Sequence, residues 1–203
     1  MTRLHADFYS RDTLTVAREL VGRYLVRRLD GTDLVCRITE TEAYIGAVDK
    51  ACHAYGGRRT PRTETLYAVP GTCYVYLIYG MYCCLNLVTE AQGTAAAVLI
   101  RGAVPVYHTD AIARRRFGVP AGEMTAYQRK NFLNGPGKLC QGLEITRAQN
   151  GLDVENGELF LCTDLPELGL DATTPAVRTG KRIGIDYAEE AADFLWRFYE
   201  PIQ

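Results

Sequence analysis

The chain lacks the features of membrane, secreted and disulfide-stabilised proteins. Its 203 residues contain no apolar run of 18, and the stretch MTRLHADFYSRDTLTV has no apolar segment of the signal-peptide type. Seven cysteines are present, but their number is odd and no Cys-x-x-Cys pair occurs. These absences argue against a membrane span, a secretory signal and a zinc or redox motif. They favour reduced, buried thiols in a cytoplasmic protein.

The chain also lacks a strong net charge, since 23 basic residues stand against 24 acidic ones and give a formal charge of −1. A protein that binds nucleic acids usually carries a visible basic excess. A nucleic-acid partner would therefore have to be held by a local cluster of basic residues. No repeat, low-complexity tract or linker is present, and the length predicts one domain over residues 1–203.

The pattern of apolar residues predicts a mixture of strands and helices. Strands are predicted over 24–29, 34–44, 95–100, 159–162 and 182–185. Helices are predicted after a cap at Ser10 as far as Gly22, over 107–117, over 122–132, and from NGPGKL through Ile145. With a hairpin turn at 30–33, this order indicates an α+β fold with a largely antiparallel sheet.

A tyrosine-rich hairpin is predicted over residues 71–86, GTCYVYLIYGMYCCLN. Tyr74 and Tyr76 alternate with apolar residues, so their rings share one face of a strand. Tyr79-Gly80 suits a tight turn because glycine accepts positive φ. The prediction therefore places Tyr79 at the exposed tip of the hairpin, an unusual position for a large aromatic ring.

The segment ETEAY, residues 40–44, is the best candidate for chemistry. On a strand, Glu40, Glu42 and Tyr44 project to one face, and Thr41 and Ala43 project to the other. A solvated edge strand explains this pattern about as well as a general base held beside an aromatic platform. A paired-carboxylate glycosidase is less favoured, because two neighbouring acids on one strand repel each other instead of dividing acid and base roles.

Histidine and arginine residues follow ETEAY. His53 has no second ligand pair at zinc spacing and suits the edge of an aromatic pocket better than a metal site. The loop GGRRTPR places Arg58, Arg59 and Arg62 within five residues, which suits phosphate contacts and equally suits a solvated loop. Lys138, near the start of a helix, is a second candidate for a phosphate contact.

Five segments strongly resemble the alkyladenine (3-methyladenine) DNA glycosylase family, in the family's order and spacing from about residue 8 to the C-terminus. They are ETEAYIGAVDKACHAYGGRRTPR, PGTCYVYLIYGMYCCLN, VLIRGAVP, NGPGKLCQGLEI and RIGID. The resemblance implies a bacterial-type member with a curved, largely antiparallel sheet, flanking helices and a protruding hairpin. This fold resembles the C-terminal domain of methionyl-tRNA formyltransferase.

The resemblance also implies roles for the matching residues. Glu42 matches the general base for the attacking water, and Arg101 matches a residue that helps to place that water. Tyr79 matches the side chain that enters the DNA stack when a nucleotide is flipped out. The residues expected to line the base pocket are Tyr44, His53, Tyr76 and Asn86, the last excluding the exocyclic amine of guanine. The residues expected to contact the DNA backbone are Arg58, Thr60, Arg62, Met81, Tyr82 and Lys138.

The function expected from the resemblance is base excision repair of double-stranded DNA in the bacterial cytoplasm. The substrates would be purines of the 3-methyladenine, 7-methylguanine, hypoxanthine and ethenoadenine type. No lysine stands at a Schiff-base position, so a monofunctional glycosylase is expected. The protein is also expected to act as a monomer, with no cofactor, metal or membrane. An abasic-site endonuclease is expected to act on its product. Two alternatives stay open, a non-catalytic nucleic-acid-binding module and a small-molecule hydrolase that uses Glu42.

Overall fold

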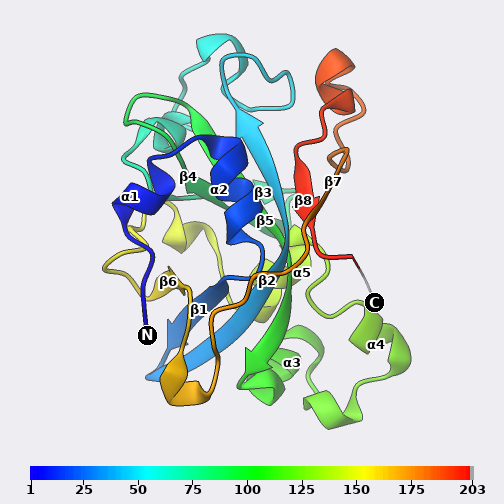
Figure 1. Cartoon of the computed structure of the whole chain (residues 1–203). Coiled ribbons are helices and arrows are strands. Elements are labelled where there is room, and N and C mark those ends of the chain that lie inside the picture. Colours follow the sequence, from blue (N-terminus) through cyan, green and yellow to red (C-terminus); the bar gives the residue numbers. More distant parts are fainter. Residues whose placement is uncertain (202–203) are drawn as a thin grey trace.

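The computed structural model describes residues 1–201 and contains one eight-stranded antiparallel sheet with helices packed around it (Figure 1). The strands are β1 (Tyr24–Leu29), β2 (Thr32–Ile45), β3 (Cys73–Ile78), β4 (Tyr82–Val88), β5 (Ala96–Tyr107), β6 (Leu159–Cys162), β7 (Arg178–Gly180) and β8 (Arg197–Tyr199). The α-helices are α1 (Ala6–Tyr9), α2 (Thr13–Leu20), α3 (Thr109–Phe117), α4 (Ala126–Lys130) and α5 (Pro136–Gly142). The 3-10 helices are η1 (Tyr55–Gly57), η2 (Glu64–Tyr67), η3 (Ala121–Glu123), η4 (Arg147–Gln149), η5 (Pro166–Leu168) and η6 (Glu189–Asp193). Within residues 1–201, every helix is too short or too polar to cross a bilayer.

Strand β2 lies in the middle of the sheet. The strand order is β3-β4-β5-β2-β1-β6, and β8 pairs with both β2 and β7. β1 pairs with the first half of β2, and β8 pairs with residues 40–42 of β2. β5 pairs with β2 along its opposite edge. Shifts of register near Ile38–Thr41 interrupt the β2–β5 ladder, and such bulges bend a strand. The sheet is therefore curled, and the predicted α+β class is confirmed; the likeness to the formyltransferase domain stays a prediction.

The two faces of the sheet have different contents. One face carries the main hydrophobic core, in which Val75, Val98 and Ile100 pack with residues of α2, α3 and α5. Alternate residues of the same strands, including Tyr74 and Tyr76, belong to a smaller cluster on the opposite face. The period of two along each strand thus separates the main core from the aromatic surface that carries the candidate site.

Both predicted hairpin turns are confirmed. Asp30 and Gly31 join β1 to β2 with φ of 49° and 77°, and Tyr79, Gly80 and Met81 join β3 to β4, with φ of 51° and 70° at the first two of these residues. Two consecutive residues with positive φ, as at Asp30-Gly31, are typical of the two-residue hairpin turn that matches the twist of the flanking strands. The predicted bounds of β1 and β6 also agree with the structure.

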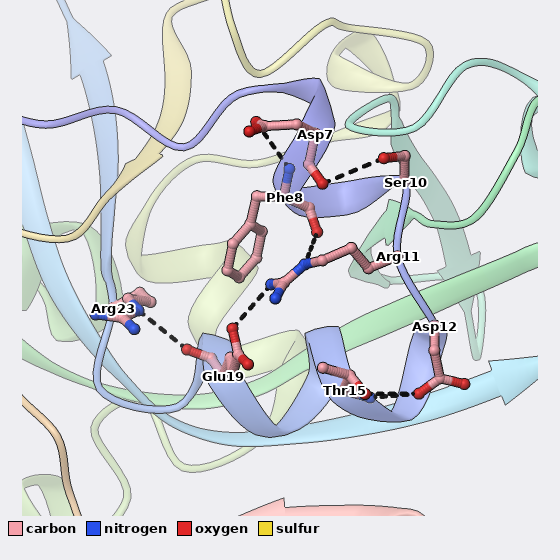
Figure 2. Close-up of polar contacts among 8 residues, drawn as sticks. All are labelled: Asp7, Phe8, Ser10, Arg11, Asp12, Thr15, Glu19 and Arg23. Carbon is pink, nitrogen blue, oxygen red and sulfur yellow. Dashed lines mark hydrogen bonds and ion pairs between the residues drawn. The ribbon is translucent and has the colours of Figure 1, made fainter.

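The predicted start of the first long helix is wrong. The Ser10 hydroxyl follows α1 and donates to the Asp7 carbonyl at 3.2 Å, whereas the Asp12 carboxylate accepts the Thr15 N–H at 2.8 Å and caps α2 (Figure 2). Both residue types are good caps, and only the backbone conformation at Asp12 decides between them. The predicted stop is close, because Gly22 adopts a φ of 92° just after the helix.

Other predicted elements differ in extent. The helix predicted over 107–117 begins at Thr109, because residues 101–107 extend β5 alongside β2. Within 122–132, the helix α4 covers five residues, and α5 ends at Gly142 before reaching Ile145. Residues 182–185 form no strand, because Gly184 adopts a φ of 76° and interrupts the extended backbone.

Candidate active site

Glu42 is a fully buried carboxylate in the middle of the sheet, with 0% exposure. Its backbone lies opposite Leu99 of β5 on one side and Arg197 of β8 on the other. The interpretation of ETEAY as a solvated edge strand is therefore wrong. Burying a carboxylate is costly unless it is hydrogen-bonded or paired, so its surroundings require an explanation.

The predicted division of the ETEAY side chains between the two faces is confirmed. The Thr41 hydroxyl points into the main core and donates to the Ala17 carbonyl of α2 at 2.7 Å. On the opposite face, the Arg101 Nε lies 3.0 Å from a Glu40 oxygen and 3.6 Å from a Glu42 oxygen. One guanidinium on β5 thus holds both acids of β2, which offsets the repulsion between them.

Each oxygen of the Glu42 carboxylate receives a hydrogen bond. The Ile183 N–H donates to Oε1 at 2.9 Å, and the Tyr44 hydroxyl donates to Oε2 at 2.8 Å. Burial raises the pKa of Glu42, while the Arg101 charge and the two hydrogen bonds oppose this increase. A carboxylate whose pKa is raised in this way is a stronger base than an exposed one. Its geometry is also fixed from two sides.

An aromatic cavity lies next to this carboxylate. Its walls are formed by Tyr44, Ala51, Cys52, His53, Leu66, Tyr74, Tyr76, Asn86 and Ala97. All four residues predicted to line the base pocket are in this set. The cavity measures about 20 Å³, enough for about one water molecule. The rings of His53 and Tyr76 meet edge to face at 4.6 Å, so a purine enters only if these two rings move apart.

His53 is held in its neutral form at the mouth of the cavity. Its Nδ1 lies 2.9 Å from the Tyr74 hydroxyl, and its Nε2 lies 3.5 Å from an Arg62 nitrogen. Burial, with a contribution from the Arg62 charge, lowers the pKa of His53 to about 4. Because Arg62 only donates, the arrangement fits a tautomer in which Nε2 accepts and Nδ1–H donates to Tyr74. Tyr74 was not among the predicted pocket residues, although it shares a strand face with Tyr76.

Asn86 is buried in the wall of the cavity and its amide orientation is fixed. It lies opposite Tyr74 across the β3–β4 hairpin, and its Nδ2 donates to the Tyr74 carbonyl at 3.1 Å. A second, longer contact of 3.5 Å joins the same nitrogen to the Cys84 carbonyl. A short side chain anchored to two strand carbonyls is a rigid part of the wall rather than an adaptable one.

A larger polar cleft of about 330 Å³ shares Ala51, Cys52 and His53 with the cavity. Its lining includes the predicted backbone-contact residues Arg58, Thr60 and Arg62, together with Lys50 and Tyr187. The third arginine of the loop, Arg59, instead makes two hydrogen bonds of 2.8 and 2.6 Å to the Glu64 carboxylate. The local basic cluster therefore depends on Arg58 and Arg62.

The hairpin tip is exposed as predicted. Tyr79 is 87% exposed, and the neighbouring Met81 and Tyr82 are also exposed. Tyr82 packs on Gly137 of α5, where an added Cβ would lie 2.9 Å from the Tyr82 Cβ. This close approach joins the hairpin to the helix and explains why a glycine is needed at position 137.

Lys138 is also on α5, but its ammonium is already engaged. It donates to the side-chain oxygens of Asn131 and Asn134, each at 2.9 Å. Burial and the nearby charges of Arg116 and Arg101 lower its pKa. A phosphate would have to compete with the two amides for this lysine.

Two candidate site residues, Asp49 and Arg182, were not predicted from the sequence. Arg182 donates to both carboxylate oxygens of Asp49, and both side chains are fully buried. The pair lies directly beside Ile183, whose N–H bonds Glu42. The two residues are 133 positions apart, and no local pattern could have joined them.

Metal ligands and disulfides do not organise this region. In residues 1–201, no group of three or more His, Cys, Asp or Glu side chains is placed to hold a metal ion. The seven cysteines are free thiols, and all except the half-buried Cys83 are buried.

Comparison with known proteins decides the family. A sequence model described as methylpurine-DNA glycosylase (MPG) matches residues 7–202. The chain belongs to the methylpurine-DNA glycosylase family. A relative from Clostridium perfringens strain SM101 is 54% identical over 97% of this chain and 95% of its own length. Relatives from Clostridium botulinum strain Loch Maree and Clostridium acetobutylicum are 49% and 48% identical, over 97% of this chain and 95% and 93% of theirs. All three are named provisionally as 3-methyladenine DNA glycosylases.

Family membership confirms the resemblance that the sequence motifs indicated. It makes the chain a DNA repair glycosylase, a hydrolase whose substrate is DNA. The roles of the individual residues remain predictions and are taken up below.

Proposed function

We propose that the chain flips damaged purines out of duplex DNA and hydrolyses their N-glycosidic bond, leaving an abasic site. The substrates would be purines of the 3-methyladenine, 7-methylguanine, hypoxanthine and ethenoadenine type. A base inside a duplex is inaccessible to an enzyme, and flipping costs a few kcal/mol. The protein must therefore supply a side chain that fills the gap, a pocket for the base and a group that activates water.

Glu42 is the proposed general base. A water molecule gives a proton to the Glu42 carboxylate as its oxygen bonds to the anomeric carbon. The electron pair of the broken carbon–nitrogen bond leaves with the purine. Arg101, which lies 3.6 Å from Glu42, is proposed to help place that water. The buried, doubly hydrogen-bonded carboxylate beside an aromatic cavity is the single observation that carries this proposal.

The base is proposed to stack among Tyr44, His53 and Tyr76, after the His53 and Tyr76 rings part. Stacking of one base on aromatic rings contributes about 1–3 kcal/mol. Alkylation at a ring nitrogen makes a purine cationic and strengthens its attraction to the faces of the rings. A His53 of pKa about 4 is neutral at pH 7 and so does not repel such a base.

The DNA backbone is proposed to run along the polar cleft and past the hairpin. Arg58, Thr60 and Arg62 line the cleft, and its connection to the aromatic cavity through His53 suits a strand whose base has been flipped. Beyond Tyr79, in the hairpin and on α5, the proposed backbone contacts are Met81, Tyr82 and Lys138. A local basic cluster of this kind is compatible with a protein of formal charge −1.

The proposed enzyme is monofunctional and needs neither metal nor cofactor. Lys50 lines the cleft, but hydrogen bonds to Glu189 and Glu190 raise its pKa and keep its amine protonated. A protonated amine is no nucleophile, so a Schiff base at the abasic sugar is not expected. We further propose that the protein acts as a monomer and that an abasic-site endonuclease processes its product.

The deciding experiment is incubation of the protein with duplexes that contain one hypoxanthine or one 3-methyladenine. Free base, quantified by mass spectrometry, and alkali-sensitive abasic sites should appear in equal amounts. Strand breaks before alkali treatment would contradict the monofunctional mechanism. If neither duplex releases its base, the chain acts as a binding module or on a different substrate.

Asn86→Ser is expected to weaken discrimination against normal guanine. Guanine differs from hypoxanthine by an exocyclic amine, and the fixed Asn86 amide is proposed to crowd that amine. Relief of one such contact should raise the ratio of guanine to hypoxanthine release by about tenfold or more. The ratio is measured in one preparation, so that a change in folded fraction cancels. Equal decreases of both rates would show that Asn86 serves only the structure of the sheet.

A further inference from the structure

The fully buried pair Asp49–Arg182 joins the loop that follows β2 to the segment between β7 and β8. The Arg182 guanidinium donates to both Asp49 oxygens, with one distance of 2.7 Å. It also donates to the Ala43 carbonyl of β2 at 2.8 Å and to the Ala191 carbonyl of η6 at 3.1 Å. Asp49 in turn accepts the Ala51 N–H at 2.9 Å. A single planar group thus fixes three stretches of chain relative to one another.

This arrangement determines where the next residue places its N–H. The backbone from Arg182 leads directly to Ile183, whose N–H donates to Glu42 Oε1. Ala43, to which Arg182 bonds, is the neighbour of Glu42 on β2. The carboxylate and its donor are therefore both tied to the same guanidinium, one residue away on each side.

Arg182 also supports a wall of the aromatic cavity. Its guanidinium lies over the ring of Tyr44, 4.6 Å from the centroid, and 5.2 Å from that of Trp196. The Tyr44 hydroxyl is the second donor to Glu42. Both hydrogen bonds of the Glu42 carboxylate thus come from groups that Arg182 holds in place.

Stability alone gives little reason for such a pair. Removing two charges from water costs several kcal/mol for each ion, and buried pairs are often no more stabilising than apolar residues of similar volume. Their better attested advantage is that they enforce one geometry. Here the geometry that they enforce is that of Glu42, the proposed general base.

We propose that Asp49 and Arg182 are positioning residues for catalysis, which hold the Ile183 N–H and the Tyr44 ring against the Glu42 carboxylate. Neither side chain touches the DNA or the water; both act through Glu42 and its two donors. This inference rests on the proposed role of Glu42 as the general base.

The test compares Arg182→Lys and Asp49→Asn with a matched control, Arg27→Lys. Arg27 is also buried and paired with a carboxylate, that of Glu158, but it lies on β1. The first two variants should lose about 10- to 100-fold in single-turnover excision at pH 7, the size typical of a misplaced catalytic group. Arg182→Lys keeps the positive charge, and its loss of the Ile183 hydrogen bond disfavours the charged carboxylate, so the acidic limb of its pH–rate profile should move up by about one unit. The control should keep the wild-type limb.

The pH comparison is informative because the other groups around Glu42 are the same in every variant. These groups are Glu40, Tyr44, Tyr76, Cys84, Arg101 and Arg197. A merely structural pair would lower the melting temperature and the active fraction but leave the limb in place. That result, or an unchanged excision rate in a folded Arg182→Lys protein, would overturn the proposal.

A measurement on the wild-type protein covers the case in which the variants do not fold. The Glu42 carboxyl carbon and the Ile183 amide are followed by NMR as a function of pH, without DNA. The Ile183 amide should shift with the same midpoint as Glu42, and an amide that does not follow Glu42 would refute the positioning role. Because this readout needs no excision, a wild-type protein that releases no base would refute the proposed function separately.

Discussion

Glu42→Gln is expected to lose about 10²- to 10⁴-fold in single-turnover base excision while it still binds lesion-containing duplex. Glutamine has the same shape and can still accept the Ile183 N–H, but it cannot take a proton from water. Excision is measured with enzyme in excess, and binding is measured separately by fluorescence anisotropy. Glu40→Gln is the matched control, since Glu40 shares the contact with Arg101 but should lose less than about tenfold.

The same substitution should not destabilise the fold. The pKa of Glu42 is raised by burial, so the folded protein holds this proton more strongly than the unfolded chain does. The carboxyl group therefore favours folding at low pH, and this advantage is lost as the pH rises from the ordinary carboxyl range through the raised pKa. At pH 7, Glu42→Gln should melt at the wild-type temperature or above it. A large drop in melting temperature together with lost excision would make Glu42 a structural residue.

Tyr79→Ala is expected to reduce the flipped fraction of the target base by about 5- to 150-fold, equivalent to about 1–3 kcal/mol. Tyr79 is the most exposed of the large hydrophobic residues described, so its removal should leave stability nearly unchanged. Its ring is proposed to fill the space from which the nucleotide departs. The fluorescence of 2-aminopurine beside the lesion reports flipping, and the loss should be smaller opposite a mismatch, where unstacking is already easier.

Tyr127→Ala provides the matched control for the tip of the hairpin. Tyr127 is 76% exposed and lies on α4, outside the β3–β4 hairpin. The Tyr127→Ala variant should flip the target base to the same extent as the wild type. Equal flipping by Tyr79→Ala and the wild type would place the inserted side chain elsewhere, with Met81 and Tyr82 as the next residues to test.

Several parts of the fold followed from local sequence because their causes are local. Asp30-Gly31 makes a two-residue turn and Tyr79-Gly80-Met81 a three-residue turn, and the alternation on either side sets the strands that they join. The side chains of ETEAY divide between two faces because the period of a strand is two. The start of α2 was misplaced by two residues because Ser10 and Asp12 are both suitable caps.

Pairing between distant strands decided what local patterns left open. Tyr107 ends β5 instead of starting a helix because it pairs with Val35 of β2. Glu42 was as compatible with an exposed edge as with a buried centre, and only its pairing with β5 and β8 and the packing of the Ile183 segment on its carboxylate decide the matter. Sequence patterns carry the period of an element but not the identity of its neighbours.

The sequence by itself determined the family, the aromatic hairpin and the residues that its motifs mark, because these depend on residue types at short, fixed spacings. The tertiary structure decided how the Glu42 carboxylate is held and how narrow the aromatic cavity is. It also decided that Asp49 and Arg182 meet across 133 positions. These features arise from contacts between segments that only the folded sheet brings together. Such long-range contacts leave no periodic pattern in the sequence.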